Sequence, residues 1–444
     1  MQNQHWFLTH HAVSLANNLL VLAFVVALLR QRRRPVGSAI AWLLSVVLIP
    51  YIGIPLYLIF GGRKLGQRIR SKQRLATDAR AGALGALETT LDRVEWLDDG
   101  VLAYERFMSE IGGAQRSIRI ATFLLADDPT GRSVVHALLL RARQGLEVRL
   151  LIDDLLRFHA PRELLRELVL AGARVERFMP LFHLPFRGHG NLRNHRKIAL
   201  FDGERAIVGG MNLGNEYMGP TADSERWRDL SLLVSGPGVS DLDAIFRADW
   251  EFATSERLTP APLAKAGEIP VRVVPSGPDS ATDPIYDADL TAIFRAERRI
   301  WIATPYFVPD EALLRALAIA VRRGVDVRVL SPERSNHALS DFASASCLRD
   351  LSSAGVSIRR FDKMLHAKTL LVDDRLAVVG SANFDMRSLF LNFEVALFFS
   401  SGPEIARLNR WFEESFGHCR LGPRPAGALR SAIDDVARLV APLL

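Results

Sequence analysis

The chain carries the same unusual string of residues twice. In each copy a lysine follows a histidine by two positions, an aspartate follows the lysine by five, and a turn of small residues ends in an asparagine. The first copy consists of His195, Lys197, Asp202, Gly209, Gly210 and Asn212, and the second of His366, Lys368, Asp373, Gly380, Ser381 and Asn383. Two histidines brought together can carry out a two-step displacement, in which one attacks and the other transfers a proton.

The residue types in these strings suit the cleavage of a phosphodiester, which is a stable anion. A neutral imidazole can attack phosphorus to give a phospho-histidine, while the second histidine protonates the departing alkoxide and then deprotonates the incoming alcohol. Lys197 and Lys368 share a strand face with their histidines and can clamp the phosphoryl oxygens. The predicted phosphate-binding set is completed by Asn212, Ser381, Asn383 and the backbone at Gly210. This chemistry requires no metal, and no metal-ligand spacing is visible in the sequence.

Each histidine needs an acidic partner that fixes its tautomer. Asp202 and Asp373 complete the strings and are grouped with the catalytic residues, but they have the opposite strand parity, so a structural role is the alternative. Better candidates for orienting the histidines are Asp229 and Glu394, which lie in matching strand-like runs downstream. For all these acids the competing interpretation is a salt bridge at the surface.

The strings belong to a longer internal duplication, in which residues 117–122 match residues 299–304 in the same order. Short β-branched runs alternate with helical stretches, which predicts two α/β halves with mixed or parallel sheets. The predicted segments are the first half (97–257), a joint (258–269), the second half (270–420) and a helical tail (421–444). A pseudo-twofold axis would bring one His-Lys string from each half to a shared cleft.

Two uncharged apolar runs occupy residues 1–62, which we expect to anchor the chain in a membrane. The runs cover about 12–29 and 37–60, and a bilayer span needs ~20 apolar residues. Helix-breaking residues between 50 and 55 interrupt the second run, so it either crosses the membrane or dips into it and returns. Residues 63–96 are predicted to form a basic juxtamembrane linker. We expect the C-terminal region on the cytoplasmic side, which either topology allows.

The composition favours an anionic partner. With 444 residues, the chain is too long for one ordinary domain. A net charge of +7 and 49% hydrophobic residues fit an anionic membrane or nucleic acid. Two cysteines, Cys347 and Cys419, provide neither a disulfide framework nor a metal-ligand cluster.

With both strings in place, the chain resembles the phospholipase D superfamily, and further segments narrow this resemblance to the bacterial cardiolipin synthases over nearly the whole chain. These segments are Pro50–Tyr57, Trp227–Asp229, Thr304–Asp310, Gly380–Ser388 and Asn392–Glu394. The first string has Gly210 where the second has Ser381, a pattern associated with the same group. The resemblance implies two tandem phospholipase D-like α/β halves behind an N-terminal membrane region, in the inner membrane of a bacterial cell.

The resemblance also implies a reaction. A histidine would attack one phosphatidylglycerol and release glycerol, and the glycerol hydroxyl of a second phosphatidylglycerol would then take the phosphatidyl group to give cardiolipin. By the same analogy His195 is the nucleophile and His366 the general acid and base. The implied partners are phosphatidylglycerol, cardiolipin and an anionic membrane, with no cofactor and no nucleic acid. A homo-oligomer is compatible with the sequence, which leaves the oligomeric state open.

Three other functions stay open on the residues alone. A hydrolytic phospholipase D, or a synthase with another donor or alcohol, would carry the same motifs, because acceptor choice depends on pocket residues outside them. A phosphodiesterase acting on nucleic acid would suit the positive charge, but the two apolar runs and the lack of an evident basic-aromatic track count against it. A non-catalytic membrane scaffold is hard to reconcile with two intact His-Lys-Asn sets.

Overall fold

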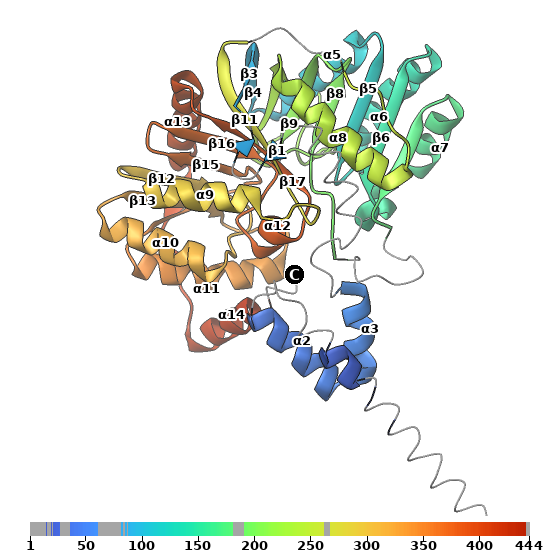
Figure 1. Ribbon diagram of the computed structural model, residues 1–444. Helices are drawn as coiled ribbons and strands as arrows, with labels where there is room; N and C mark the ends of the chain where they lie inside the picture. The colour runs from blue at the N-terminus through green and yellow to red at the C-terminus, as the bar shows by residue number, and fades with distance from the viewer. Residues whose placement is uncertain are drawn as a thin grey trace, which may run out of the picture. The chain divides into compact units, whose positions relative to one another are not determined.

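The computed structural model of the chain (Figure 1) describes residues 15, 19, 21–26, 36–60, 81–82, 85–86, 88–180, 191–261 and 267–440. The chain divides into two compact units. The smaller unit contains Met1–Leu65 and Leu181–Leu192, and the larger one contains Gly66–Pro180 and Arg193–Pro442. Both histidine strings therefore lie in the larger unit.

A seven-stranded sheet forms the first half of the larger unit, in the order β4-β10-β9-β8-β5-β6-β7. Its strands are β4 (Arg93–Leu97), β5 (Ser117–Thr122), β6 (Glu147–Asp153), β7 (Arg174–Phe178), β8 (Ile198–Phe201), β9 (Arg205–Gly209) and β10 (Ser231–Ser235). The neighbours β5, β6 and β7 run parallel, and the other neighbours pair antiparallel.

A nine-stranded sheet forms the second half, in the order β18-β14-β13-β12-β15-β16-β17-β11-β3. Its strands are β3 (Thr89–Leu91), β11 (Ile269–Ser276), β12 (Arg299–Ala303), β13 (Asp326–Pro332), β14 (Ser357–Phe361), β15 (Thr369–Val372), β16 (Leu376–Gly380), β17 (Glu394–Phe399) and β18 (Cys419–Leu421). Here β12, β13 and β14 run parallel and the rest antiparallel. A separate ribbon joins β1 (Ala81–Gly82) and β2 (Gly85–Ala86).

The two sheets follow one plan. The order β7-β6-β5-β8-β9-β10-β4 corresponds strand by strand to β14-β13-β12-β15-β16-β17-β11, with the same pattern of parallel and antiparallel neighbours. The predicted duplication of α/β halves is therefore confirmed, and the sheets are mixed. The central strands are buried along their whole length, as expected for sheets covered by helices.

Helices pack on both sheets (Figure 1). The first half has α5 (Gly100–Gly113), α6 (Pro129–Arg143), the short η1 (Asp154–His159), α7 (Arg162–Leu170) and α8 (Gly238–Thr254). The second half has α9 (Pro284–Arg295), α10 (Glu311–Arg322), α11 (Ala338–Ser353), α12 (Met386–Phe390), α13 (Gly402–Phe416) and α14 (Ala428–Val440). The equivalent helices α6 and α10 begin at capping aspartates, Asp128 and Asp310. Both are followed by a glycine with positive φ, at Gly145 (89°) and Gly324 (87°), where the sequence predicts the helices to end.

Segments outside the predicted halves also belong to these sheets. Strand β3 and all but the last residue of β4 lie in the segment 63–96 that we expected to be a linker, and the two strands pair with β11 and β10. At the other end β18 crosses the predicted boundary at residue 420 and pairs with β14, and α14 of the predicted tail packs on α11 through an ion pair of 2.7 Å between Arg349 and Asp434. The linker prediction was therefore too long, and its part 63–80 lies outside the described residues. Of the predicted joint, residues 262–266 also lie outside them.

The smaller unit is built from α2 (Val36–Leu48) and α3 (Pro50–Phe60), which pack against each other. A Cβ atom at Gly53 would lie 2.2 Å from the backbone oxygen of Ser45, so only glycine permits this close approach. The ring of Tyr57 meets the rings of Trp42 and Phe24 edge-on, with centroids 5.4 and 5.9 Å away. These contacts give the helix pair a small apolar core.

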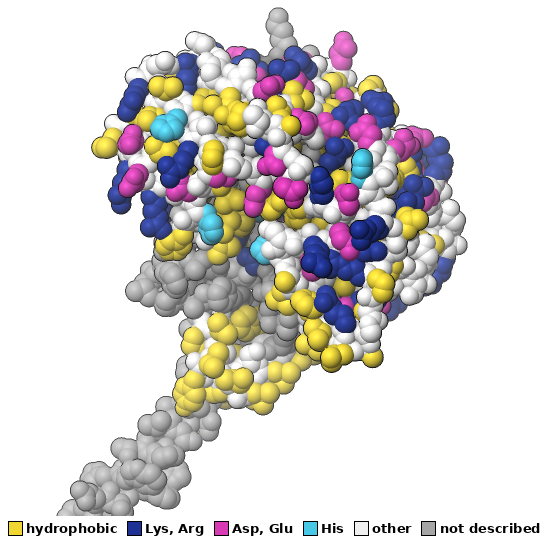
Figure 2. Space-filling view, turned by 180° about the vertical axis from the view of Figure 1, so that it is seen from behind, with side chains coloured by type: hydrophobic (Ala, Val, Ile, Leu, Met, Phe, Trp, Pro, Cys, Tyr) yellow, Lys and Arg dark blue, Asp and Glu magenta, His cyan; other side chains and the backbone are white. Residues whose placement is uncertain are grey.

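Other apolar side chains of this unit remain exposed. Leu48, Tyr51 and Ile52 are 71%, 79% and 59% exposed, and hydrophobic side chains are prominent on the visible surface of this helix pair (Figure 2). The predicted run 12–29 lies mostly outside the described residues. Within the described part of the chain, no helix combines the length and apolar character that a membrane crossing requires.

One buried acid in the second half stands apart from the site. Asp289 on α9 is 3% exposed, and within the described structure its Oδ1 atom has no hydrogen-bond partner. Burial raises the pKa of Asp289 from 3.8 to about 8. The folded protein thus retains a proton that the unfolded chain releases, so this residue lowers the free energy of unfolding as pH rises from about 4 to about 8.

We expect the Asp289→Asn variant to lose this pH dependence, because the amide has the same shape and no charge. Its melting temperature should exceed that of the parent at pH 8, and the difference should shrink at pH 5. Glu268→Gln, at an exposed acid, is the matched control and should leave both temperatures unchanged. A constant difference between parent and Asp289→Asn from pH 5 to 8 would contradict the assignment.

Candidate active site

Both histidine strings lie at equivalent places in the two sheets. His195 and Lys197 directly precede β8, and His366 and Lys368 directly precede β15, the strand that matches β8. The four residues are 8%, 5%, 4% and 2% exposed, in that order. All four side chains are therefore enclosed by the protein, where the local dielectric makes charges and hydrogen bonds strong.

Backbone hydrogen bonds join the two halves beside each histidine. The His195 amide donates to the Phe393 carbonyl over 2.9 Å, and the His366 amide donates to the Arg228 carbonyl over 2.7 Å. Each bond belongs to an isolated parallel bridge between one half and the other. Exchanging the two halves converts one contact into the other, so the contacts have the relation that a pseudo-twofold axis requires.

Each histidine is oriented by an acid from the opposite half. The Nδ1 atom of His195 lies 3.0 and 3.1 Å from the two carboxylate oxygens of Glu394. The Nδ1 atom of His366 lies 2.6 Å from Oδ2 of Asp229. An Nδ1–H donated to the carboxylate fixes the tautomer and leaves Nε2 available for chemistry. The structure thus places both predicted orienting acids beside a histidine, and it shows that each acid comes from the half that does not contain its histidine.

Both rings are held neutral. Burial, reinforced by the nearby lysines and opposed by Glu394, lowers the pKa of His195 to about 4. Burial and Lys368 lower the pKa of His366 to about 3, against the effect of Asp229. Burial opposes ionisation of the two acids, but their histidines hold the pKa of Asp229 and of Glu394 below the usual values. Each pair is therefore a neutral imidazole and a carboxylate at pH 7, as a nucleophile or base requires.

The two lysines fold back toward their histidines. The Nζ atom of Lys197 donates to the His195 carbonyl at 2.7 Å, and that of Lys368 donates to the His366 carbonyl and lies 2.8 Å from Nδ1 of the same ring. Burial lowers the pKa of Lys197 well below 10.5 and that of Lys368 to about 8. A bound anion would restore their full charge.

Gly210 and Ser381 serve the acids in two different ways. A Cβ atom at Gly210 would lie 2.1 Å from Oδ1 of Asp229, so the carboxylate occupies the space that a side chain would need. The Ser381 hydroxyl donates to Glu394 and accepts from the Val395 amide. These hydrogen bonds of Ser381 hold the acid that orients His195, and its phosphate-binding role stays a prediction.

The two asparagines of the strings are also buried, at 2% for Asn212 and 5% for Asn383. Asn212 accepts a hydrogen bond of 3.3 Å from the Leu124 amide and bonds to the hydroxyl of Tyr217. Asn383 bonds to Asp385, and its Oδ1 atom has no partner in the described structure. Their phosphate-binding role stays a prediction.

Asp202 and Asp373 do not reach the histidines. They follow β8 and β15 at the far end from the strings, with φ of 56° and 52°. Asp202 accepts from the amides of residues 115–117, and Asp373 from those of residues 297–299. The structure corrects their placement among the catalytic residues: each ties a turn to the start of the adjacent strand, which is the structural alternative that strand parity allowed.

Aromatic rings from outside the two histidine strings contact both histidines. Phe123 meets His195 edge-on at 5.0 Å between centroids, and Tyr217 and Trp227 contact His366 at 5.0 and 5.5 Å. All three rings come from the first half. Tyr217 follows the Asn212 turn and Trp227 precedes Asp229 by two, so proximity to predicted residues was the available signal.

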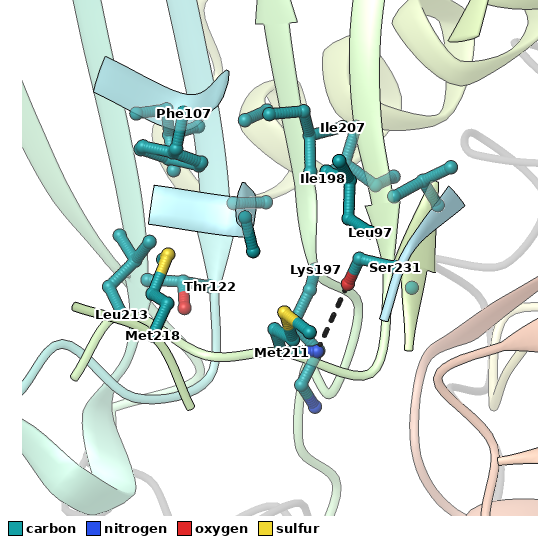
Figure 3. A pocket seen from close by; sticks show the side chains of 16 residues that line it. Leu97, Phe107, Thr122, Lys197, Ile198, Ile207, Met211, Leu213, Met218 and Ser231 are labelled. Atoms are coloured by element: carbon teal, nitrogen blue, oxygen red, sulfur yellow. Dashed lines mark hydrogen bonds between the residues drawn. The ribbon is translucent and has the colours of Figure 1, made fainter. Parts of the chain in front are cut away.

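An apolar pocket in the first half adjoins Lys197 (Figure 3). Its lining is mostly hydrophobic and includes Phe107, Ile207 and Met211, whose amide donates to the Ser231 hydroxyl at 3.3 Å. Among the residues that the structure describes, no group of three or more His, Cys, Asp or Glu could hold a metal ion.

The contact between Gly210 and Asp229 can be tested directly. We expect Gly210→Ala to push Asp229 away from His366 and lower kcat by about 100-fold, since small misplacements of catalytic groups are costly. Gly112→Ala, at a helical glycine with no atom within 4 Å, is the matched control and should retain parental kcat. The kcat of both purified variants is measured by steady-state turnover. A parental kcat in Gly210→Ala would show that Asp229 keeps its position when residue 210 carries a Cβ atom.

The chain matches known sequences over almost its whole length. The family described as "Cardiolipin synthase, PLD-like domain" matches residues 107–250 and 290–416, and the phospholipase D-nuclease N-terminal family matches residues 19–62. The chain is 33% identical to a cardiolipin synthase of Geobacillus thermodenitrificans, with 98% of this chain and 93% of that protein covered. It is also 33% identical to the major cardiolipin synthase of Bacillus subtilis, with 87% and 90% covered.

Solved structures share the fold at lower identity. Phosphatidylserine synthase of Haemophilus influenzae has a TM-score of 0.64 and 14% identity, covering 84% of this chain and 100% of its own. Polyphosphate kinase of Porphyromonas gingivalis has a TM-score of 0.50 and 14% identity, covering 72% of this chain and 46% of its own. Together with the family match over both duplicated halves, these findings show that the chain belongs to the cardiolipin synthases of the phospholipase D superfamily.

Proposed function

We propose that this protein condenses two phosphatidylglycerol molecules into cardiolipin and glycerol through a phospho-histidine on His195. As a member of its family the protein is a phosphatidyltransferase. The observation that carries the proposal is the pair of buried neutral imidazoles, each with an acid from the opposite half on Nδ1. Such a pair can attack with one Nε2 atom and transfer a proton with the other.

In the first step Nε2 of His195 forms a bond to the phosphorus of the donor lipid. The bond from phosphorus to the glycerol headgroup breaks, and His366 gives its proton to the departing oxygen. The free ring of His366 is neutral, so the protonated form depends on the anionic phosphodiester that enters beside it. Asp229 then stabilises the imidazolium from the other side.

In the second step neutral His366 removes the proton from a hydroxyl of a second phosphatidylglycerol. That oxygen bonds to phosphorus, the bond to His195 breaks, and cardiolipin leaves. Lys197 and Lys368 contribute positive charge to the phosphoryl oxygens throughout, and Asn212 and Asn383 supply amide groups at the same place. The aromatic rings around both histidines limit access of water, which would otherwise hydrolyse the intermediate to phosphatidic acid.

Membrane association agrees with this substrate. The smaller unit exposes apolar side chains on α2 and α3, and the match to the phospholipase D-nuclease N-terminal family covers this region. We infer that residues 1–62 attach the protein to an anionic cell membrane and that the larger unit works on its cytoplasmic side. We further propose that the basic residues that follow Gly62 in the sequence bind anionic headgroups.

The decisive experiment supplies purified protein in liposomes with phosphatidylglycerol as the only lipid. We expect cardiolipin and glycerol in equal amounts, and loss of both products in His195→Ala and in His366→Ala. Mass spectrometry resolves the lipids. Phosphatidic acid without cardiolipin would indicate a hydrolase, and no turnover would exclude phosphatidylglycerol as the sole substrate.

The lysines predict an alkaline limb in the pH profile. Because the pKa of Lys368 is about 8, this side chain is charged below pH 8 and loses its charge above it. We expect kcat/KM for phosphatidylglycerol, which reports on the free enzyme, to fall as pH rises through about 8. In Lys368→Arg any remaining turnover should lack this limb, because arginine stays charged. A flat parental profile up to pH 9.5 would contradict the assignment.

A further inference from the structure

We propose that the buried ion pair of Arg196 and Asp249 positions Glu394 and thereby holds His195 for attack. The inference rests on the proposed function, because it assumes that His195 takes part in the reaction. Arg196 stands between His195 and Lys197 in the first string. By strand alternation its side chain leaves on the face opposite to theirs, so it is a positioning residue and not a catalytic one.

The ion pair is fully enclosed. The Nη1 atom of Arg196 lies 2.7 Å from each carboxylate oxygen of Asp249 on α8, and the two side chains are 3% and 0% exposed. Asn194 adds a hydrogen bond of 3.1 Å to the same carboxylate. An arginine at this depth is retained only when its charge and its donors are satisfied.

The remaining donors of the same guanidinium reach the second half. Nε donates to the Glu394 carbonyl at 3.0 Å, and Nη2 donates to the Ser276 carbonyl at 3.1 Å. One planar group therefore ties α8 of the first half to β17 and β11 of the second. Because Glu394 is the first residue of β17, the bond to its carbonyl sets where its side chain begins.

The side chain of Glu394 continues this chain of contacts to the catalytic ring. Its carboxylate accepts hydrogen bonds from the Ser381 hydroxyl and, at 3.4 Å, from the side-chain amide of Asn392. The same carboxylate lies 3.0 Å from Nδ1 of His195. Arg196 thus fixes the backbone of the acid, while Ser381 and Asn392 fix its carboxylate. The orientation of His195 depends on both.

The second string lacks an equivalent guanidinium. Ala367, fully buried, stands between His366 and Lys368 where Arg196 stands in the first string. His366 is flanked instead by Tyr217 and Trp227. Within the described structure, the ion pair of Arg196 and Asp249 therefore supports the His195 site and has no counterpart between His366 and Lys368.

The test variant is Arg196→Lys, which keeps a charge for Asp249 but cannot form the planar three-way fork. We expect kcat for cardiolipin formation to fall about tenfold or more while KM for phosphatidylglycerol stays within about twofold, because the donors of this guanidinium bond to Asp249, Glu394 and Ser276. Arg119→Lys is the matched control. Arg119 on β5 pairs at 2.8 Å with Asp243, which lies on α8 as Asp249 does, and the two side chains are 10% and 2% exposed. The Arg119→Lys variant should retain parental kcat even if its melting temperature falls.

A double-mutant cycle distinguishes positioning from general stability. In the background of Glu394→Gln, adding Arg196→Lys should lower the residual kcat by no more than about twofold, because the interaction through which Arg196 acts is already impaired. If the two losses multiply, or if Arg196→Lys retains parental kcat, the inference is wrong.

A readout without turnover separates this inference from the proposed function. The rate at which diethyl pyrocarbonate modifies each histidine can be followed by peptide mass spectrometry. We expect Arg196→Lys to change the rate at His195 and to leave that at His366 unchanged. If the parent makes no cardiolipin but His195 alone responds, the proposed function fails and the positioning role stands. An unchanged rate at His195, or an equal change at both rings, would overturn the positioning role.

Discussion

The exchange of acids between the two halves is the interaction on which the rest of the structure depends. Glu394 reaches His195 and Asp229 reaches His366, so neither half contains a complete histidine-acid pair of its own. The backbone bonds from His195 to Phe393 and from His366 to Arg228 fix the same junction. A shift of one half against the other would therefore disturb both pairs together.

Much of this architecture could be predicted from the sequence, because a duplicated pattern reports each feature twice. The matching strands, the glycines that end α6 and α10, and the two histidine strings are local signals that repeat along the chain. The same repetition identified Asp229 and Glu394 as equivalent acids. The assignment of each acid to the histidine of the other half was out of reach, because it depends on how the halves dock and not on any spacing within one half.

The residues whose roles sequence reasoning missed all depend on contacts with other elements of the fold, which local spacing does not show. Asp202 and Asp373 belong to the strings by sequence, yet a positive φ and three backbone amides hold each of them at the far end of its strand. Ser381 was predicted to bind phosphate because hydroxyls bind anions, and the sequence did not reveal that a buried carboxylate at the start of the next strand accepts its hydrogen bond. Arg196 was overlooked because a residue between two catalytic ones points to the other face, where its role depends on α8, β11 and β17.

The positions of the adjacent strands β3 and β4 constrain the order in which the two sheets can form during synthesis. They are separated by a single residue, yet β4 joins the first sheet and β3 joins the edge of the second, beside β11. Synthesis from the N-terminus makes β3 before the whole first half, whereas its partner strand emerges only after that half is finished. Strand β3 therefore stays unpaired until β11 has been synthesised. A nascent chain stalled between the halves would carry a completed first sheet and no working catalytic pair.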